Sequence, residues 1–557
     1  MSEAPRTPTA VIRAEPDGYD MGKTKLMGRQ AAGHGFLRAA VMGRGEHPIF
    51  GYTPSQGSAR GFERIVGEID PTARFQWMPA DQLERLGEVG VLYLADITVA
   101  THARLRLRAG VGAFSLCGVT HTTASAGAMD EIVGLLREPV APWDALVCTS
   151  TSVVETVRRI HEAEADYLRW RLGPEVRIQG PQLPLIPLGV HCDDFEITPE
   201  ARAEARAEFG LDDDVMVGLF VGRLVFHAKA HPFPMFRGFQ LAAERTGRKL
   251  ALILSGWFPN KGVENAFIQG AAQFAPDVQL IVLEGREAAA KARAWGAADL
   301  FVSLSDNIQE TFGLTPVEAM AAGLPLVVSD WNGYRDTVRD GIDGVRVPTA
   351  APALGGGQAL VRALETGGFN YDQYCWATAA TISVDIEGVA AAVAAMAVSP
   401  DLRRRMGEAG RQRARDVYDW PVVYRQYQAL WAELNARRKA DTANPEIAAR
   451  LKAAPTSGAS RLDPFNAFGH YATRALGPSA RLELIPGADS QTLRAILNHG
   501  LFSALSSPHD HIERAFAAIA AQPGLTARDC ATAIGVPVPG TIRAIGLLMK
   551  VGLVRRV

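Results

Sequence analysis

The sequence predicts an α/β protein with two doubly wound domains, because short buried strands alternate with amphipathic helices in two successive series. Apolar strands that alternate with helices in this way are typical of parallel sheets. The chain has 557 residues, too many for a single core, which also predicts several domains. The predicted strands are 9–14, 90–96, 144–150 and 183–189 in the first series, and 215–222, 250–256, 278–285, 299–305 and 324–330 in the second.

The break between the two series gives the expected domain boundaries. We assign an N-terminal Rossmann-like domain to 1–195 and a C-terminal Rossmann-like domain to 196–418. An aromatic helix at 419–436 has its apolar positions at helical spacing, so we expect it to pack in a core and to complete the first domain. The stretch 365–384 interrupts the pattern as an insertion, and the polar stretch 437–462 predicts a linker.

The remaining tail, 463–557, is predicted to be a small, mostly helical domain. Its end resembles a winged-helix domain, with a capped helix from Thr526, a turn at Gly535, a second helix and a Gly-Leu-Val run that opens a wing. The tail holds nine Arg and Lys against six Asp and Glu, and its second helix offers little beyond Arg543 and Lys550. So few cations argue against the binding of duplex DNA, which needs many phosphate contacts. We therefore favour a role in binding a protein or peptide, in positioning an acceptor or in forming a homodimer.

Bulk composition limits the classes of function. The net charge of −2 predicts no general attraction to nucleic acid or to anionic membranes. The five cysteines form no CxxC or Cys/His cluster, which argues against structural zinc and a disulfide framework. No apolar run has the length of a membrane span, and the N-terminus lacks the apolar segment of a signal peptide. We therefore expect a cytoplasmic protein.

The stretch 306–323, DNIQETFGLTPVEAMAAG, contains two glutamates with different explanations. Glu318 fits a capping box in which Thr315 is the N-cap and Pro316 the first helical residue, although it could also bind a substrate. Glu310 has no such structural explanation. It follows the predicted strand 299–305, in a loop that points to the ligand edge of the sheet.

The same loop predicts an anion site. Gly313 allows a close backbone approach, and the free N–H groups at the start of the next helix attract a phosphate. A phosphate held there would have one acid on either side, within reach of sugar hydroxyls. The constellation therefore predicts a nucleotide sugar as ligand.

This stretch resembles the Glu-x7-Glu signature of retaining GT-B glycosyltransferases, in the large family-4-like group that includes glycogen and sucrose synthase-like enzymes. The resemblance covers roughly residues 10–436 and implies the GT-B fold, with the acceptor domain at 1–195 and the nucleotide-sugar donor domain at 196–418. It also implies that Glu310 contacts the transferred sugar and that Glu318 binds the ribose. Asp336 stands where the family often has a glutamate. The distal phosphate would be held by the backbone amides of Phe312, Gly313 and Leu314 and by the Thr315 hydroxyl.

Other candidate site residues come from separate segments. Arg223 and Lys229 follow a buried strand at a spacing that resembles the family pattern, and two cations suit a leaving diphosphate; both could instead be surface residues. His121 follows an apolar segment, where a structural role is common, but the family has a histidine under the transferred sugar at the matching position. Gly28 and Gln30 lie in a glycine-rich stretch that the family places over donor and acceptor.

The alternating arginines at 104, 106 and 108 are interpreted as a solvated face, with an anionic acceptor site as the alternative. The sequence contains no P-loop and no GxGxxG after its first strand. We expect a retaining hexosyltransferase that uses a UDP- or GDP-linked sugar, needs no metal or cofactor, and acts on an acceptor that is a glycan, a lipid-linked molecule, a peptide or a small molecule. The alternatives are a GT-B phosphorylase or epimerase, and a DNA- or protein-binding regulator with a degenerate GT-B module.

Overall fold

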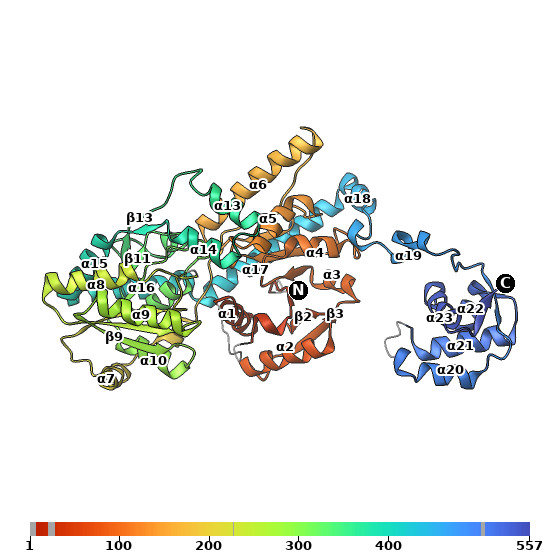
Figure 1. Cartoon of the computed structure of the whole chain (residues 1–557), viewed down its shortest axis with the longest axis horizontal. Coiled ribbons are helices and arrows are strands. Elements are labelled where there is room, and N and C mark those ends of the chain that lie inside the picture. Colours follow the sequence, from red (N-terminus) through yellow and green to blue (C-terminus); the bar gives the residue numbers. More distant parts are fainter. Residues whose placement is uncertain (1–6, 21–27, 227, 503–506) are drawn as a thin grey trace, which may run out of the picture. The chain divides into compact units, whose positions relative to one another are not determined.

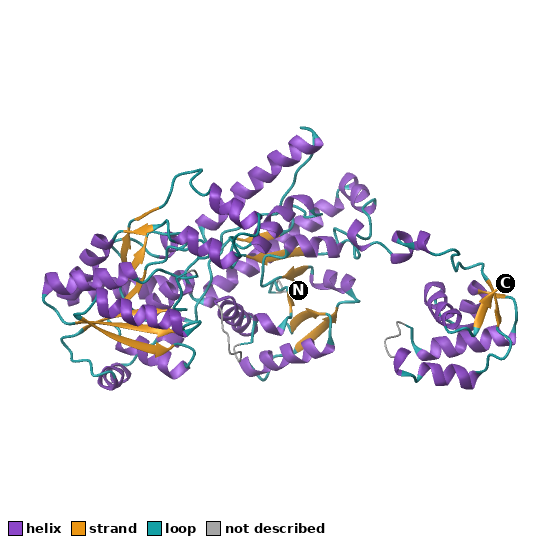
Figure 2. Ribbon diagram, in the orientation of Figure 1, coloured by secondary structure: helices purple, strands orange, loops and turns teal. Residues whose placement is uncertain are grey.

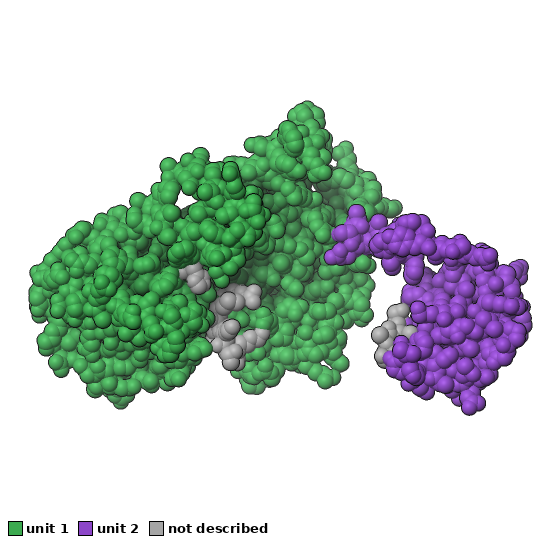
Figure 3. Space-filling model, viewed as in Figure 1, with its two compact units in different colours: residues 1–458 green, residues 459–557 purple. Residues whose placement is uncertain are grey.

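The computed structural model describes residues 7–20, 28–226, 228–502 and 507–557. The chain forms two compact units, 1–458 and 459–557, which are coloured separately in Figure 3. The larger unit contains two parallel six-stranded sheets with helices on both faces (Figure 1, Figure 2). The prediction of two Rossmann-like α/β domains is confirmed.

The first sheet has the strand order β3-β2-β1-β4-β5-β6, and all of its pairings are parallel. This is the dinucleotide-fold order, in which the direction of winding reverses between β1 and β4. Its strands are β1 (Val11–Arg13), β2 (Ile49–Thr53), β3 (Phe75–Pro79), β4 (Val91–Tyr93), β5 (Ser115–Val119) and β6 (Ala145–Val147). Its main helices are α1 (Gly28–Met42), α2 (Gln56–Ile69), α4 (Val99–Arg106), α5 (Ala126–Arg137) and α6 (Thr151–Leu172).

The second sheet has the order β12-β11-β10-β7-β8-β9, which is the same winding counted from β7. The reversal therefore falls between β7 and β10, and ligands of such sheets bind beyond the carboxyl ends of the strands at this point. Its strands are β7 (Met216–Val221), β8 (Leu250–Gly256), β9 (Val278–Glu284), β10 (Leu300–Ser303), β11 (Leu326–Ser329) and β12 (Gly344–Val347). Its helices are α7 (Pro199–Glu208), α8 (Phe233–Thr246), α9 (Lys261–Phe274), α10 (Ala288–Ala297), α11 (Leu314–Ala321), α12 (Tyr334–Thr337), α15 (Ile386–Val398) and α16 (Pro400–Arg413).

The stretch 183–189, predicted to be a strand, forms only one isolated bridge among the described residues, from Leu185 to Cys148 just after β6. Cys148 N–H donates to Pro184 O over 2.9 Å, and Ile186 N–H donates to Cys148 O over 3.1 Å. Pro184 and Pro187 have no N–H to donate, so a continuous ladder cannot form here.

Helix α17 (Trp420–Ala443) confirms the prediction that the aromatic helix packs in a core. Its side chains Trp420, Tyr427 and Trp431 surround Phe36 of α1 and share a buried cluster with the first sheet. Tyr93 of β4 stacks on Phe36 with ring centroids 4.1 Å apart. Helix α17, which follows the second domain in sequence, is therefore anchored in the N-terminal domain.

The linker predicted for 437–462 is partly wrong, because α17 continues to Ala443 and α18 (Pro445–Lys452) follows it. The helix is held beyond 437 by tertiary contacts that its polar composition does not reveal. Arg438 is buried and donates to Gly112 O and Ala113 O over 3.1 and 3.2 Å.

The predicted insertion is longer than 365–384. Strands β13 (Thr349–Ala350) and β14 (Ser383–Val384) pair with each other and close the insertion at its base. It carries α13 (Gln358–Glu365), which has no buried residue, and α14 (Tyr371–Ala379), which buries Cys375 and Ala379.

The smaller unit has a three-stranded antiparallel sheet, β16-β15-β17, beside helices that share one apolar core. Thr526 caps α22 (Ala527–Ile534), Gly535 ends it in a left-handed conformation, and α23 (Val538–Lys550) follows. The other elements are β15 (Arg481–Leu484), α20 (Ser490–Leu497), α21 (His509–Ala521), β16 (Leu525–Thr526) and β17 (Val554–Arg556). Throughout the described chain, no single helix is both long and apolar enough to span a membrane; α22 and α23 pass only as a pair bent by 109°.

Candidate active site

The candidate site lies at the point where the second sheet reverses its winding. Arg223 follows β7, and Glu310 lies in the loop that follows β10, the neighbouring strand in the sheet. Because parallel strands end at the same edge, two segments 87 residues apart in sequence meet there. Glu310 and Lys229 are in direct contact, with Lys229 Nζ 3.4 Å from Glu310 Oε2.

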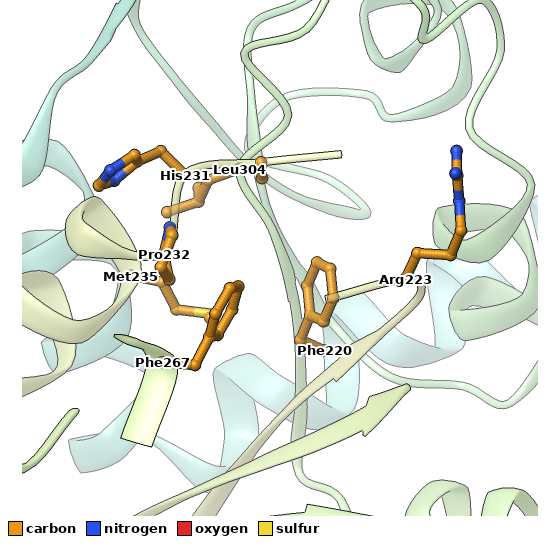
Figure 4. Close-up of a pocket in the computed structure, with 8 residues that line it drawn as sticks. Phe220, Arg223, His231, Pro232, Met235, Phe267 and Leu304 are labelled. Atoms are coloured by element: carbon orange, nitrogen blue, oxygen red, sulfur yellow. The ribbon is translucent and has the colours of Figure 1, made fainter. Parts of the chain in front are cut away.

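Arg223 supplies a cation without a close protein partner. No described residue forms a hydrogen bond or an ion pair within 4.0 Å of its guanidinium. Burial lowers the pKa of Arg223 from its usual value, and the carboxylates of Asp372 and Glu310 act in the opposite direction. Figure 4 shows the side chain directed away from the rings of Phe220 and Phe267. An unpaired, partly buried guanidinium suits an anionic ligand.

Aromatic stacking supports the loop that carries Lys229. Phe226 stacks on Phe267 of α9, with ring centroids 5.3 Å apart, and also on His231 at 5.6 Å. His227, which the sequence analysis did not place in the site, lies outside the described residues. The apolar pocket behind this loop, shown in Figure 4, is lined by Phe220, Arg223, Ala230, His231, Pro232, Met235, Phe267 and Leu304.

The Glu310 loop is held in place by contacts with the segment that contains Asn332 and Tyr334. Gly313 has a φ of +88°, and a Cβ there would lie 2.2 Å from the Tyr334 ring, so only glycine fits. Asn332 is the one non-glycine among the described residues with a positive φ, +46°, and its side-chain amide donates to Glu310 O. Gly313 is the N-cap of α11, which places the first N–H groups of this helix beside the loop. Phe312 is buried, whereas Leu314 and Thr315 are partly exposed.

The capping-box interpretation of Glu318 is wrong. Helix α11 begins at Leu314 with Gly313 as N-cap and without a side-chain cap, so Thr315 lies inside the first turn. Glu318 is then in the second turn, too far along to reach the N-cap amide. The residue is only 8% exposed, its carboxylate lies 3.5 Å from Lys291 Nζ, and no described residue donates a hydrogen bond to its Oε2.

His121 approaches the same loop from the N-terminal domain. Thr311 Oγ1 donates to His121 O over 3.2 Å, and His121 Nε2 donates to Ala95 O over 3.1 Å. Ser150 Oγ also donates to Thr311 O over 2.6 Å. The structure thus brings His121, Glu310, Lys229 and Arg223 to one place where the two domains meet.

Asp336 stands at the position where the family that this sequence resembles often has a glutamate. Its side chain is bound by Thr151 of the N-terminal domain. Its carboxylate accepts from Thr151 N–H over 2.5 Å and from Thr151 Oγ1 over 2.7 Å. Thr151 is the first residue of α6, so the acid lies at a helix N-terminus, where a negative charge is favoured.

Asp306 is a site residue that the sequence analysis missed. It is 3% exposed, its Oδ2 accepts from His231 N–H over 3.2 Å, and its Oδ1 has no hydrogen-bond partner among the described residues. Burial raises the pKa of Asp306 to about 7. Its position directly after the apolar run 299–305 was the available signal, since ligand-facing residues follow strands.

Two other predictions have different outcomes. Gly28 begins α1 and is exposed, Gln30 is buried, and residues 21–27 lie outside the described residues, so the role of Gly28 and Gln30 stays a prediction. The solvated face proposed for the alternating arginines is wrong for Arg106, which is fully buried and paired with Asp144. Arg104 pairs with Glu138, so neither arginine is available for an anionic acceptor.

The comparisons with known proteins agree with this geometry. Residues 201–354, which hold Arg223, Lys229, Glu310 and Glu318, match the family model "Glycosyl transferases group 1". The D-inositol 3-phosphate glycosyltransferase of Geodermatophilus obscurus is 32% identical over 181 residues, which are 30% of this chain and 37% of that protein. The same enzyme from Nocardia farcinica is 30% identical over 168 residues, 30% of this chain and 36% of that protein. The match therefore spans less than two fifths of these two relatives.

A solved structure extends the match to both domains. The crystal structure of Anabaena HepE in complex with UDP aligns with a TM-score of 0.50 and 14% identity, over 76% of this chain and 98% of HepE. At this identity the alignment shows the fold alone. Two Rossmann-like domains of this topology define the GT-B fold, with the glycosyltransferase group 1 match confined to the second domain.

Proposed function

We propose that this chain is a retaining glycosyltransferase that moves a hexosyl group from a UDP- or GDP-linked sugar to a hydroxyl of an acceptor. The observation that carries the proposal is the meeting of Glu310, Lys229 and the unpaired Arg223 beside the N-terminus of α11. Cations and helix N–H groups suit a diphosphate, and a carboxylate beside them suits the hydroxyls of the attached sugar.

In the proposed reaction, the acceptor oxygen attacks the anomeric carbon from the face that the diphosphate leaves. The bond from this carbon to the diphosphate oxygen breaks as the new glycosidic bond forms, and the acceptor proton passes to the leaving diphosphate. Arg223, Lys229 and the α11 amides stabilise the growing negative charge. Because these groups supply positive charge beside the leaving diphosphate, we propose a reaction without a metal ion or cofactor.

The first test is the stereochemistry of transfer. Thermal-shift screening of UDP- and GDP-sugars identifies the donor, and NMR of the product made from it gives the configuration of the new bond. We expect a stabilising shift with one nucleotide class and a product with the anomeric configuration of the donor. An inverted product would contradict the retaining mechanism.

Glu318→Gln tests the proposed ribose contact. Loss of a charged hydrogen-bond acceptor is expected to weaken UDP or GDP binding about tenfold in a calorimetric titration. Because Glu318 does not cap α11, the melting temperature should stay close to that of the wild type. A large loss of melting temperature with unchanged nucleotide affinity would show that the residue is structural.

For the smaller unit we propose a winged-helix-type domain outside the transfer chemistry. The capped α22, the turn at Gly535, α23 and the following β17 support this topology. The substrate in the relatives' name, D-inositol 3-phosphate, is not proposed for this chain, because the match covers only 37% of that enzyme.

A further inference from the structure

Helix α14 of the insertion is packed against the candidate active site. Tyr371, Cys375 and Ala379 recur at every fourth position and form the inward face of the helix, with Cys375 and Ala379 buried. Gln309, the residue before Glu310, directs its side-chain amide at Cys375 Sγ over 3.6 Å. The insertion therefore borders the Glu310 loop directly.

The first turn of α14 is held in a defined place. Asn370 and Gln373 form a capping box with both hydrogen bonds present, each 2.9 Å long. The hydroxyl of Tyr371 is buried among Thr122, Gln309 and Cys375. Because Thr122 adjoins His121 and Gln309 adjoins Glu310, the start of α14 touches the loops of both domains that enter the site.

Asp372 follows Tyr371 in this turn and so lies beside the same loops. It is exposed; burial lowers the pKa of Arg223, and the charges of Asp372 and Glu310 raise it. Glu310 is itself paired with Lys229. The site thus contains two cations, Arg223 and Lys229, and two carboxylates, one of which comes from the insertion.

We propose that Asp372 is a counter-charge that competes with a nucleoside diphosphate for Arg223 and so limits how tightly the site holds the donor and the released product. The inference rests on the proposed function, since it takes Arg223 as a diphosphate-binding cation. A bound diphosphate places negative charge beside Asp372, and like charges at this range repel. The insertion then sets nucleotide affinity through one exposed carboxylate.

The test is a calorimetric titration of the full chain with UDP and with GDP, before and after Asp372→Asn. The variant is expected to bind the preferred nucleotide about three- to tenfold more tightly at about 0.1 M salt. The difference should shrink at about 1 M salt, where exposed charges are screened. A merely structural change would not show this salt dependence.

Glu365→Gln is the matched control, because Glu365 is an exposed acid at the end of α13 in the same insertion. It should bind nucleotide like the wild type. Equal or weaker binding by Asp372→Asn, or equal tightening in both variants, would overturn the inference while leaving the proposed function intact. If neither UDP nor GDP binds the wild type, the proposed function fails, and this inference fails with it.

Discussion

Glu310→Gln is expected to lower both sugar transfer and slow donor hydrolysis by about 10²–10³-fold. The exchange keeps the size of the side chain but removes the charge that faces Lys229 at 3.4 Å. A carboxylate that contacts the transferred sugar matters most as positive charge develops on the ring, so the loss should appear in kcat rather than only in donor KM. Nucleoside diphosphate released in the presence and absence of acceptor measures both rates.

The fold should tolerate this change, because an ion pair of this kind contributes at most about 1 kcal/mol to stability. Glu408→Gln, which removes an exposed acid from α16, is the matched control and should keep full activity. Full activity in a folded Glu310→Gln variant would remove the residue on which the proposed function depends.

Arg106→Leu is expected to lower the free energy of unfolding by about 3–5 kcal/mol. Arg106 and Asp144 form two hydrogen bonds of 2.6 and 2.7 Å, and both side chains are fully buried. The guanidinium also donates to Phe114 O and Pro139 O, so the pair links α4 to the starts of β5 and β6. Removing it leaves the Asp144 carboxylate buried without its cation. Urea unfolding followed by tryptophan fluorescence measures the loss, with the buried Trp143 as a neighbouring probe.

Arg108→Leu is the control for this prediction, since Arg108 belongs to the same alternating run but is exposed. It should change stability by less than about 0.5 kcal/mol. The double variant Arg106→Leu with Asp144→Leu should recover part of the stability, because it removes the unpaired charge. A loss below about 1 kcal/mol for Arg106→Leu alone would show that the pair is not a structural requirement.

The sequence predicted those strands and loops whose pattern lies within one short segment. The apolar runs of the second domain predicted β7 to β11, and the Glu310 loop was located from the strand before it and the helix after it. The helix start was placed too late, at Thr315 as N-cap, because the positive φ of Gly313 depends on its packing against Tyr334. That contact joins residues 21 positions apart, which a local capping pattern does not record.

Features made by distant partners could not be predicted. The burial of Arg106 depends on Asp144, 38 residues later, and an alternating charge pattern alone favours a solvated face. The role of Asp372 depends on an insertion whose Cys375 contacts Gln309, 66 residues earlier in the chain. Strands β2, β3 and β5 were missed because a glycine, a proline or polar residues break their apolar runs.

The proposed nucleotide-sugar site is tested most directly by a crystal structure of the protein with UDP or GDP, whichever nucleotide raises its melting temperature. We expect the diphosphate to lie within hydrogen-bond distance of Arg223 and Lys229 and of the backbone N–H groups at the start of α11, with the ribose hydroxyls at Glu318. A diphosphate bound elsewhere, or a ribose without contact to Glu318, would contradict it.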